Sequence, residues 1–161
     1  MIRAATPGDV PDVLRLIREL ATYEREPDAV VATEAGLHDA LFGTDAFCSC
    51  NIAELDGDVV GFALWFRNFS TWRGRPGIYL EDLYIKPEVR GRGLGKELLM
   101  ALVDIARERG YGRVEWSVLN WNVDAQGFYR SIGAQPMDEW TVWRLTGDAL
   151  DPNAAGAPNA E

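Results

Sequence analysis

The clearest pattern of hydrophobic and polar positions lies in residues 78–110, where a strand-like stretch is followed by a helix-like one. From Ile78 to Ile85, large apolar and aromatic residues surround one acidic pair, which predicts a half-buried strand. Lys86-Pro87 ends this strand, because proline has no main-chain N–H to donate. From Leu94 onward, apolar residues recur every three or four positions, which predicts a helix that ends at Gly110.

The rest of the chain shows similar patterns on both sides of this unit. Thr6-Pro7-Gly8-Asp9 is a typical helix start with Thr6 as N-cap, and its helix is predicted to end near Tyr23. Asp56-Gly57-Asp58 predicts a tight hairpin turn, and residues 70–77 are expected to form a loop. The other predicted elements are strands over residues 2–5, 47–55, 59–69, 113–119 and 141–145, the last closing the sheet, and helices over residues 33–42 and 123–132. We expect residues 1–150 to form a single domain and residues 151–161, rich in Ala, Asn, Pro and Gly, to be a disordered tail.

The segment between the central strand and its helix, Arg90-Gly91-Arg92-Gly93-Leu94-Gly95-Lys96, has the composition of an anion-binding loop. Glycines at alternate positions let the main chain approach a ligand closely, and the first N–H groups of a helix attract a phosphate. Residues 73–96 contain six basic and three acidic residues, although the whole chain carries a formal net charge of −9. A plain glycine-rich turn that starts a helix is the alternative interpretation. The local positive charge favours the anion site.

Two familiar glycine motifs do not fit this loop. A P-loop requires glycine where Arg90 stands and Ser or Thr where Glu97 stands. A dinucleotide-binding fingerprint requires a third glycine at a spacing that this loop lacks. The pattern Arg-x-x-Gly-x-Gly does fit, through Arg90, Gly93 and Gly95, and it resembles the acetyl-CoA pyrophosphate loop of the GNAT N-acetyltransferases.

Other stretches resemble the same family, and in particular its diamine (spermidine/spermine) N-acetyltransferase branch. They are LRLIRELATYE at residues 14–24, IYLEDLYI at residues 78–85, RGRGLG at residues 90–95, and Asn122 with Phe128-Tyr129 and Gly133-Ala134. The resemblance covers residues 2–146 and implies an α/β (mixed α+β) fold. In this fold a central mixed, mostly antiparallel sheet contains a splayed parallel strand pair and is flanked by about four helices. The implied activity is transfer of an acetyl group from acetyl-CoA to a primary amine by direct attack.

The resemblance implies an acetyl-CoA site, with no metal, along the open edge of the central strand. The pantetheine arm of the cofactor would lie between the splayed strands and pair with the main chain of Leu83, Tyr84 and Ile85. The implied contacts of the pyrophosphate loop are Arg90, Gly91, Arg92, Gly93, Leu94, Gly95 and Lys96. Asn122, with Asp124 and Ala125 at the start of its helix, would border the arm on the other side. A simple N-cap role is the alternative for Asn122.

Tyr129 is the general acid that the resemblance implies. From the residue pattern alone, core packing of Phe128-Tyr129 is the alternative. CoA leaves as a thiolate whose conjugate acid has a pKa of about 8.5, and a phenol with a pKa of about 10 still carries its proton at neutral pH. Tyr129 is therefore expected to protonate the departing thiolate.

The acceptor amine must lose a proton before it attacks, because an alkylammonium has a pKa of about 10.4. Glu81 is the candidate proton acceptor or acceptor-binding residue, and Asp82 is expected to face the other side of the strand. Solvation of acids at a strand edge is the alternative for this pair, although unpaired carboxylates are costly to bury within an apolar strand. The implied substrate-binding residues are Tyr23, Glu24, Glu81 and Asp82.

One departure from the diamine branch affects the acceptor. The family has an acidic residue near the last strand for the far amine, where this chain has Trp140-Thr141. Asp138 and Glu139 are the nearest acids that could replace it. Basic amino acids similar to thialysine therefore stay open as acceptors beside diamines and polyamines.

Composition narrows the remaining choices. The chain has 161 residues, of which 47% are hydrophobic and 25% charged, and it shows no membrane-length apolar run and no signal peptide, so we expect a soluble cytoplasmic protein with no membrane partner. Its acidic balance argues against nucleic acid and suits a small cationic acceptor. Cys48 and Cys50 are expected to be packing residues, and His38 a surface residue. A homodimer is the expected assembly.

Three functions remain open on these grounds. The first is an N-acetyltransferase for a small primary amine, and Tyr129 together with Glu81 favours it. A nucleophilic cysteine with a histidine partner is missing from the pattern, so a covalent acetyl-enzyme is not expected. The second is a non-catalytic acyl-CoA-binding sensor or interaction module. The third is a protein-lysine or N-terminal acetyltransferase.

Overall fold

The computed structural model describes residues 1–150, which divide into two compact units between Ser117 and Val118. Residues 1–117 form the larger unit, and the smaller unit begins at Val118. The predicted disordered tail, residues 151–161, lies outside the described residues.

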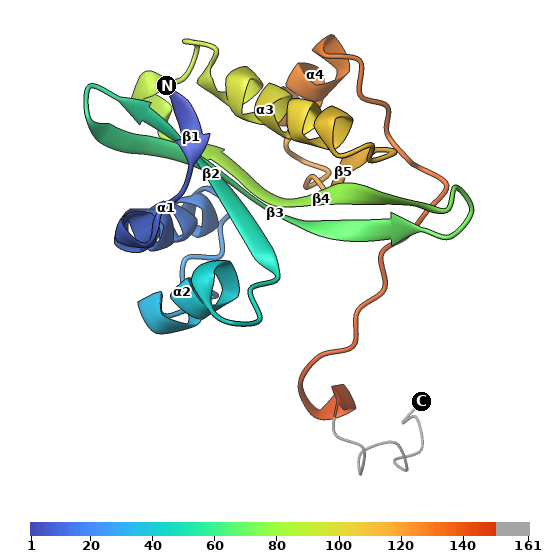
Figure 1. The fold of residues 1–161 in the computed structure, drawn as a ribbon, viewed down its shortest axis with the longest axis horizontal. Coiled ribbons are helices and arrows are strands. Elements are labelled where there is room, and N and C mark those ends of the chain that lie inside the picture. Colours follow the sequence, from blue (N-terminus) through green and yellow to red (C-terminus); the bar gives the residue numbers. More distant parts are fainter. Residues whose placement is uncertain (151–161) are drawn as a thin grey trace. The chain divides into compact units, whose positions relative to one another are not determined.

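The larger unit is built on a five-stranded sheet (Figure 1). Its strands are β1 (Ile2–Ala4), β2 (Cys48–Leu55), β3 (Asp58–Ser70), β4 (Arg75–Ile85) and β5 (Val114–Trp116), and they lie side by side in chain order. The first four pair antiparallel, and β4 pairs with β5 in parallel. The mixed, mostly antiparallel sheet that the sequence implied is therefore confirmed.

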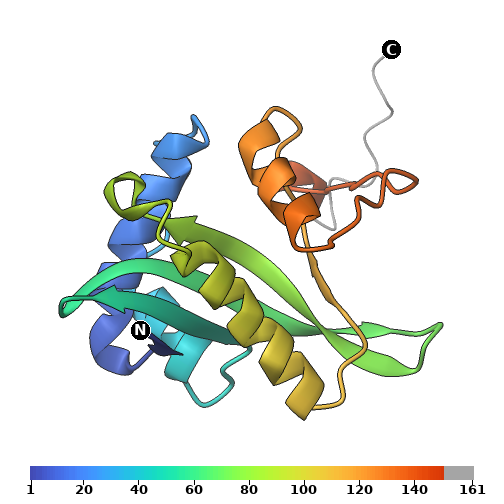
Figure 2. The same ribbon diagram turned by 90° about the horizontal axis from the view of Figure 1, so that it is seen from above.

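Helices cover both faces of this sheet (Figures 1 and 2). The helices α1 (Val10–Tyr23) and α2 (Glu34–Phe42) pack on one face, and α3 (Leu94–Glu108) runs along the other. The core on the α1–α2 face contains residues from both helices and from β2, β3 and β4: Val10, Val13, Leu14, Leu16, Leu20, Leu37, Leu41, Cys50, Ile52, Val59, Phe62, Leu64 and Tyr84. The helix α3 buries Leu94, Leu98, Leu99, Leu102 and Ala106, the apolar stripe that the sequence predicted.

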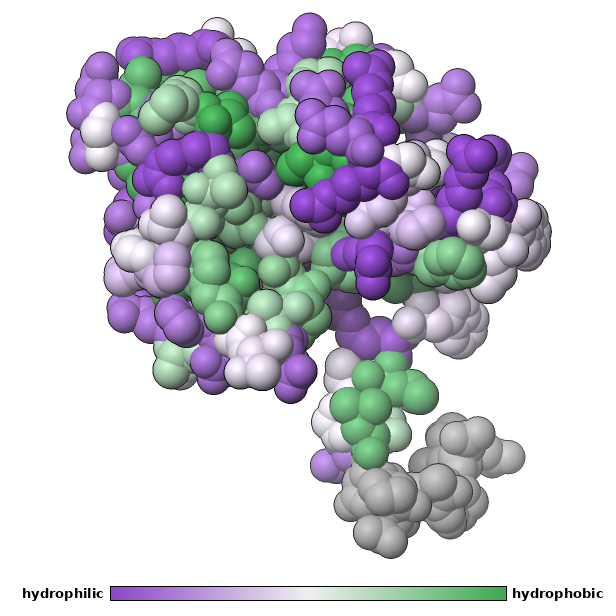
Figure 3. Space-filling view, in the orientation of Figure 1, coloured by the Kyte–Doolittle hydropathy of each residue, from purple (hydrophilic) through white to green (hydrophobic). Residues whose placement is uncertain are grey.

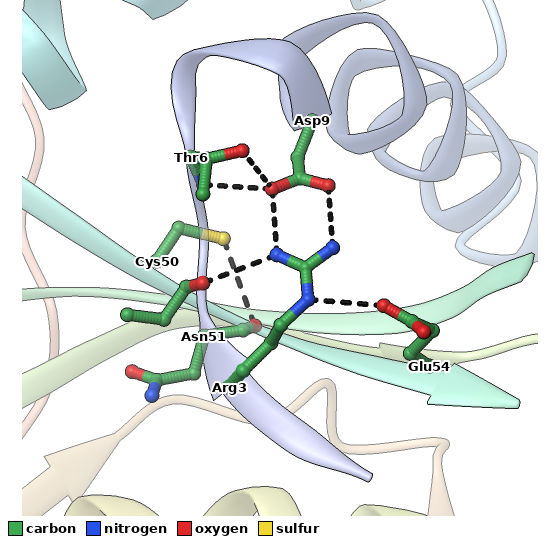
Figure 4. Close-up of polar contacts among 7 residues, drawn as sticks. Arg3, Thr6, Asp9, Cys50, Asn51 and Glu54 are labelled. Carbon is green, nitrogen blue, oxygen red and sulfur yellow. Dashed lines mark hydrogen bonds and ion pairs between the residues drawn. The ribbon is translucent and has the colours of Figure 1, made fainter. Parts of the chain in front are cut away.

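A network of charged groups fixes the start of α1, as Figure 4 shows. The guanidinium of Arg3 on β1 donates to both carboxylate oxygens of Asp9, at 2.8 and 2.9 Å, and to Glu54 on β2 at 3.0 Å. The main-chain N–H and the hydroxyl of Thr6 also donate to Asp9. Thr6 and Asp9 form a capping box around a short 3-10 helix, η1 (Pro7–Asp9), which leads into α1. The predicted helix start at Thr6 is confirmed.

Two hairpins join the antiparallel strands. Asp56 and Gly57 both have positive φ angles, 54° and 90°, as a two-residue turn of this kind requires, so the predicted Asp-Gly turn is confirmed. The prediction of a loop over residues 70–77 is wrong for half of its length. Ser70 pairs with Arg75 and Phe69 with Pro76, so the turn contains only residues 71–74. Gly and Pro in residues 74–77 have low strand propensity, so the local sequence did not indicate a strand here. The pairing with β3 depends on a distant segment, which local composition does not show.

The smaller unit contains α4 (Val123–Ser131) and a short 3-10 helix, η3 (Gly147–Leu150). The predicted closing strand over Thr141–Leu145 is wrong, because these residues form no strand among residues 1–150. Val142, Trp143 and Leu145 are exposed. Alternating apolar residues give a segment strand propensity, but a strand forms only where a neighbouring main chain completes its hydrogen bonds. The predicted strand over residues 113–119 is also shorter, since β5 covers only Val114–Trp116.

Hydrophilic residues cover most of the visible face of the described chain (Figure 3). Between residues 1 and 150, no helix is long and apolar enough to cross a membrane.

Candidate functional site

The glycine loop between β4 and α3 has the geometry that its sequence suggested. After a 3-10 turn, η2 (Pro87–Val89), the chain passes through Gly91 and Gly93, whose φ angles are +79° and +84°. No atom lies within 4 Å of the position that a Cβ on Gly91 would occupy. The loop therefore needs glycine at this position for its backbone angle and not for space.

Gly93 is the N-cap of α3, and the start of this helix can receive an anion. No side chain caps the helix, so its first N–H groups keep their hydrogen-bonding capacity for a ligand. The first intrahelical bond runs from the N–H of Glu97 to the carbonyl of Gly93 at 3.0 Å. Arg92 and Lys96 are exposed beside these groups. Free N–H groups at a helix start next to two cations fit a pyrophosphate, the group that the sequence resemblance implied here.

Arg90, the first residue of the motif, does not extend freely beside these groups. Its Nε–H donates to the main-chain carbonyl of Ile85 at 2.9 Å. Its guanidinium carbon lies 4.8 Å from the ring centroid of Tyr23 and 5.6 Å from that of Tyr84. The structure therefore places Arg90 against the end of α1 and against β4, a contact that the sequence did not indicate.

Beyond Leu80, the edge of β4 that faces away from β3 pairs with no strand among residues 1–150. Pairing with β5 covers only Ile78 to Leu80, and β5 ends at Trp116. The N–H of Lys86 donates to Val60 on β3, so in an alternating antiparallel pair Leu83 and Ile85 direct their main-chain groups away from β3. Tyr84 stands at the position between them, where main-chain groups turn toward β3. Of the three predicted main-chain contacts, the geometry thus favours Leu83 and Ile85.

The acidic pair Glu81-Asp82 lies at an irregularity in β4. Asp82 pairs with Leu64 on β3, whereas Leu80 pairs with the next residue, Trp65. Glu81 is therefore the extra residue of a β-bulge, a feature that re-aims side chains and is frequent near active sites. The bulge removes the regular alternation that would place Glu81 and Asp82 on opposite faces. Burial raises the pKa of Cys48, which packs on the α1–α2 face, and the charge of Glu81 contributes to this rise.

Asp82 is the carboxyl group with the most perturbed environment of this region. Burial, together with the negative charges of Glu81 and Glu24, raises its pKa to about 6. Burial also raises the pKa of Glu24, which follows the last residue of α1. Within residues 1–150, no cation or hydrogen-bond donor pairs with Asp82. The structure thus brings Glu24, Glu81 and Asp82 close enough to interact electrostatically.

The sequence favoured Glu81 as the proton acceptor, and it gave Asp82 only a binding role. The two acids differ in their solvent exposure, which depends on the tertiary structure. Glu81 is exposed, whereas Asp82 is half-buried in register with Leu64. Neither property can be inferred from two adjacent acids in a strand.

The two cysteines on the α1–α2 face are poor nucleophiles. Burial, together with the charges of Asp9 and Asp82, raises the pKa of the Cys50 thiol to about 12. Burial likewise raises the pKa of Cys48. A thiol that holds its proton does not attack a thioester at neutral pH. Among the described residues, no cluster of His, Cys, Asp and Glu side chains could hold a metal ion.

The smaller unit holds the remaining predicted residues. The side chain of Asn122 accepts a hydrogen bond from the N–H of Ala125 at 3.2 Å, so its N-cap interpretation is confirmed. Asp124 lies in the first turn of α4, where an acid suits the helix dipole. Tyr129 is half-buried, and its ring centroid lies 5.3 Å from that of Phe128.

Comparisons with known proteins identify similar acetyltransferases. Residues 11–134 match the Acetyltransferase (GNAT) family. The chain is 40% identical to the thialysine N-epsilon-acetyltransferase of Bos taurus over 161 residues, covering 93% of this chain and 94% of that protein. It is 35% identical to the spermidine/spermine N(1)-acetyltransferase-like protein 1 of Homo sapiens over 151 residues, covering 89% of this chain and 22% of that protein. A solved integron cassette protein from the mobile metagenome of V. cholerae has a TM-score of 0.80 and 27% identity, with 98% of each chain covered.

Proposed function

Because the chain belongs to the Acetyltransferase (GNAT) family, and within it to the diamine N-acetyltransferase branch, we propose that it acetylates a primary amine of a small cationic acceptor. Enzymes of this family take the acetyl group from acetyl-CoA. The proposed acceptor is a basic amino acid, a diamine or a polyamine. The observation that supports this proposal most directly is the half-buried Asp82, which interacts with two further acids.

The cofactor side of the proposal rests on main-chain groups. The positive φ angles of Gly91 and Gly93 and the uncapped start of α3 suit a pyrophosphate, and Arg92 and Lys96 supply positive charge. Beyond Leu80, the unpaired edge of β4 suits the amides of a pantetheine arm. These features together fit acetyl-CoA better than a free nucleotide, which has no extended amide arm.

The acceptor side of the proposal rests on charge. Glu24, Glu81 and Asp82 lie together without a basic partner among residues 1–150, so an acceptor with positive charge gains from their field. One named relative is a thialysine acetyltransferase and another carries a spermidine/spermine designation, and all three of these substances contain more than one amine. A basic amino acid is the first candidate, because the relative named for thialysine shares 40% of its residues with this chain.

Asp82 is the proposed proton acceptor, and this assignment revises the sequence-based preference for Glu81. Moving a proton from an alkylammonium to a carboxyl group costs about 1.36 kcal/mol for each unit of difference between their pKa values. A pKa raised from 3.8 to about 6 brings Asp82 closer to the amine. It lowers that cost by about 3 kcal/mol at most. Glu81 is proposed to hold the acceptor and to keep the pKa of Asp82 high.

Tyr129 is the proposed general acid. It lies on α4, one residue after Phe128 and four before Gly133, the spacing on which the family resemblance of this segment rests. A phenol with an ordinary pKa of about 10 holds its proton at neutral pH and can donate it to a departing thiolate.

The experiment that tests this function measures thiol release from acetyl-CoA with a panel of amines. We expect turnover with thialysine, lysine, ornithine and spermidine, and a higher KM for butylamine, which carries no second charge. Release with none of these amines, despite CoA binding, would favour the sensor or interaction module. Release only with peptides that contain lysine or a free N-terminus would favour the protein acetyltransferase.

A pair of matched variants tests the cofactor site in the same preparation. Gly93→Val should abolish CoA binding in calorimetry, because a β-branched residue is strained at a φ of +84° and would distort the loop. Gly110→Val imposes similar strain at a φ of +67°, just beyond the other end of α3. Its CoA affinity should stay close to that of the native protein. Equal loss of affinity in both variants would remove the assignment of the loop.

A further inference from the structure

Arg90 is the one basic residue of the glycine loop whose side chain is held by three separate contacts. Its Nε–H donates to the carbonyl of Ile85, and its guanidinium lies near the rings of Tyr23 and Tyr84. Tyr84 is buried, and its hydroxyl donates to Glu19 of α1 at 3.4 Å. The loop, the end of β4 and the end of α1 are therefore connected through a single side chain.

These contacts require a guanidinium and not simply a positive charge. The planar group can stack on an aromatic ring while its Nε–H makes a hydrogen bond within the same plane. A lysine ammonium would keep the charge, but it would lose the planar stacking and the fixed direction of the hydrogen bond. Charge and shape can thus be separated by substitution.

The contact with Tyr23 reaches the acceptor side of the site. Tyr23 is the last residue of α1, and the next residue, Glu24, is one of the acids that raise the pKa of Asp82. We infer that Arg90 is a positioning residue that couples the glycine loop to the Tyr23–Glu24 end of α1. The inference rests on the proposed function, because it assumes that the loop binds CoA and that this end of α1 faces the acceptor.

The physical reason for such a coupling is the flexibility of the loop. Gly91 and Gly93 give the free loop many main-chain conformations, and ordering them on a ligand costs conformational entropy. Arg90 stands directly before these glycines, and its three contacts hold the start of the loop in one place. Affinity for CoA should therefore depend on a ring of α1, even though the ring need not touch the cofactor.

The test measures the dissociation constant of CoA by calorimetry for variants of both residues. Arg90→Met and Arg90→Lys should each weaken CoA binding by about 5- to 20-fold, since both remove the stacking and the Nε–H bond. Tyr23→Phe, which keeps the ring, should bind CoA like the native protein, and Tyr23→Leu should weaken binding by about 3- to 10-fold. In the double variant, Arg90→Met with Tyr23→Leu, the loss should be smaller than the product of the two single losses.

Arg92→Met is the matched control, because Arg92 is a basic residue of the same loop with an exposed side chain. In the double variant Arg92→Met with Tyr23→Leu, the fold-loss of CoA affinity should equal the product of the two single losses. The inference is overturned if Arg90→Lys binds CoA like the native protein, since charge alone would then explain the residue. It is also overturned if the losses in the Arg90–Tyr23 pair multiply as they do in the control pair. If the native protein does not bind CoA at all, the proposed function fails, and the inference fails with it.

The acceptor gives a second readout of the coupling. With CoA saturating, Arg90→Lys should raise the KM of the amine by about 3- to 10-fold and lower kcat less, because it misplaces a binding surface and removes no reacting group. An unchanged KM would contradict the coupling to α1.

Discussion

Two aspartates of the larger unit, Asp9 and Asp82, show how differently one side chain can be used. Asp9 is 7% exposed and has every partner that it needs. Arg3 donates to both of its oxygens, and Thr6 donates twice to one of them (Figure 4). Hydrogen bonds from Arg3 hold the pKa of Asp9 well below its usual range.

Asp82 is half-buried without any such partner among residues 1–150, and its nearest charges are the like charges of Glu81 and Glu24. Its pKa moves in the opposite direction, to about 6. Burial raises the pKa of the Cys50 thiol, and both aspartates contribute to this rise. The two acids differ in their immediate partners, and these partners separate their roles.

On the proposed function, this difference separates a structural acid, Asp9, from a functional one, Asp82. A buried carboxylate that accepts hydrogen bonds from a guanidinium and from capping donors stabilises the fold. Its oxygens are already used in these bonds and do not bind a substrate. A half-buried carboxylate among like charges costs stability, and such a cost is typical of groups that await a cation or a proton. The predictions below test this contrast from the largest expected effect to the smallest.

Asp82→Asn should have the largest effect on activity. Removal of the proposed proton acceptor should lower kcat by about 10²- to 10⁴-fold, the usual range for general acid–base catalysis. The affinity for CoA should not change, and the thermal midpoint should rise, because a costly charge is gone. Turnover and differential scanning calorimetry on the same sample check both outcomes. Turnover near the native value would return Asp82 to a binding role and restore Glu81 as the candidate base.

Asp9→Asn should have the opposite profile. The variant leaves the guanidinium of Arg3 without its bidentate partner and weakens the capping box of Thr6. Breaking a buried ion pair costs about 3–5 kcal/mol, and since the Arg3 side chain is 31% exposed, solvent reduces the expected loss to about 2–3 kcal/mol. Urea unfolding measures this loss. For the fraction that stays folded, kcat should be close to native, and a kcat that falls with stability would contradict a purely structural role.

Asp9 and Asp82 should affect the pH dependence of the free energy of unfolding in opposite directions. The folded-state pKa of Asp9 is lowered, so its contribution is present above pH 4 or so and is lost as the pH falls. The folded-state pKa of Asp82 is raised to about 6, so its contribution is present below about pH 4 and is lost as the pH rises through 6.

Two variants make these signs visible in urea unfolding. The stability advantage of Asp82→Asn over the native protein should grow from pH 4 to pH 6.5 by about 1–2 kcal/mol, a value reduced for partial exposure. The deficit of Asp9→Asn should shrink below about pH 4. Parallel curves for the native protein and Asp82→Asn would show that the pKa of Asp82 is not raised.

Glu81→Gln should have the smallest effect. It removes an exposed like charge, so the pKa that appears in the pH profile of kcat should fall by less than about one unit. The shift should shrink as salt is added, because exposed charges are screened. Glu88→Gln, an exposed acid of η2, is the control and should leave this pKa unchanged. A loss of kcat as large as that of Asp82→Asn would show that Glu81 itself takes the proton.

Sequence and structure agree where a feature depends on neighbouring residues along the chain. The Asp-Gly turn, the Thr6 helix start, the stripe of α3 and the glycine loop were all predictable, because each is determined by local backbone preferences and by periodicity. The assignment of the glycine loop also excluded a P-loop and a dinucleotide fingerprint from spacing alone. Fold class followed from the order of these local elements together with the family resemblance.

Features that depend on pairing across the fold were not predictable. The bulge at Glu81 and the extension of β4 to Arg75 arise from register with β3, which no short stretch encodes. The segment Thr141–Leu145 has the alternation of a strand and forms none, because a strand also needs a partner edge.

The amino-acid sequence by itself determined which candidate groups the proposed reaction can use. It supplies a loop whose glycines allow positive φ angles, acids in the central strand, and a tyrosine on a late helix. Only the tertiary structure decided that Asp9 is neutralised by Arg3, that Asp82 is left among like charges, and that Arg90 turns toward Tyr23. The physical reason is that a side chain's pKa and contacts depend on burial and on charges from distant strands and helices, and these are fixed only when the chain has folded.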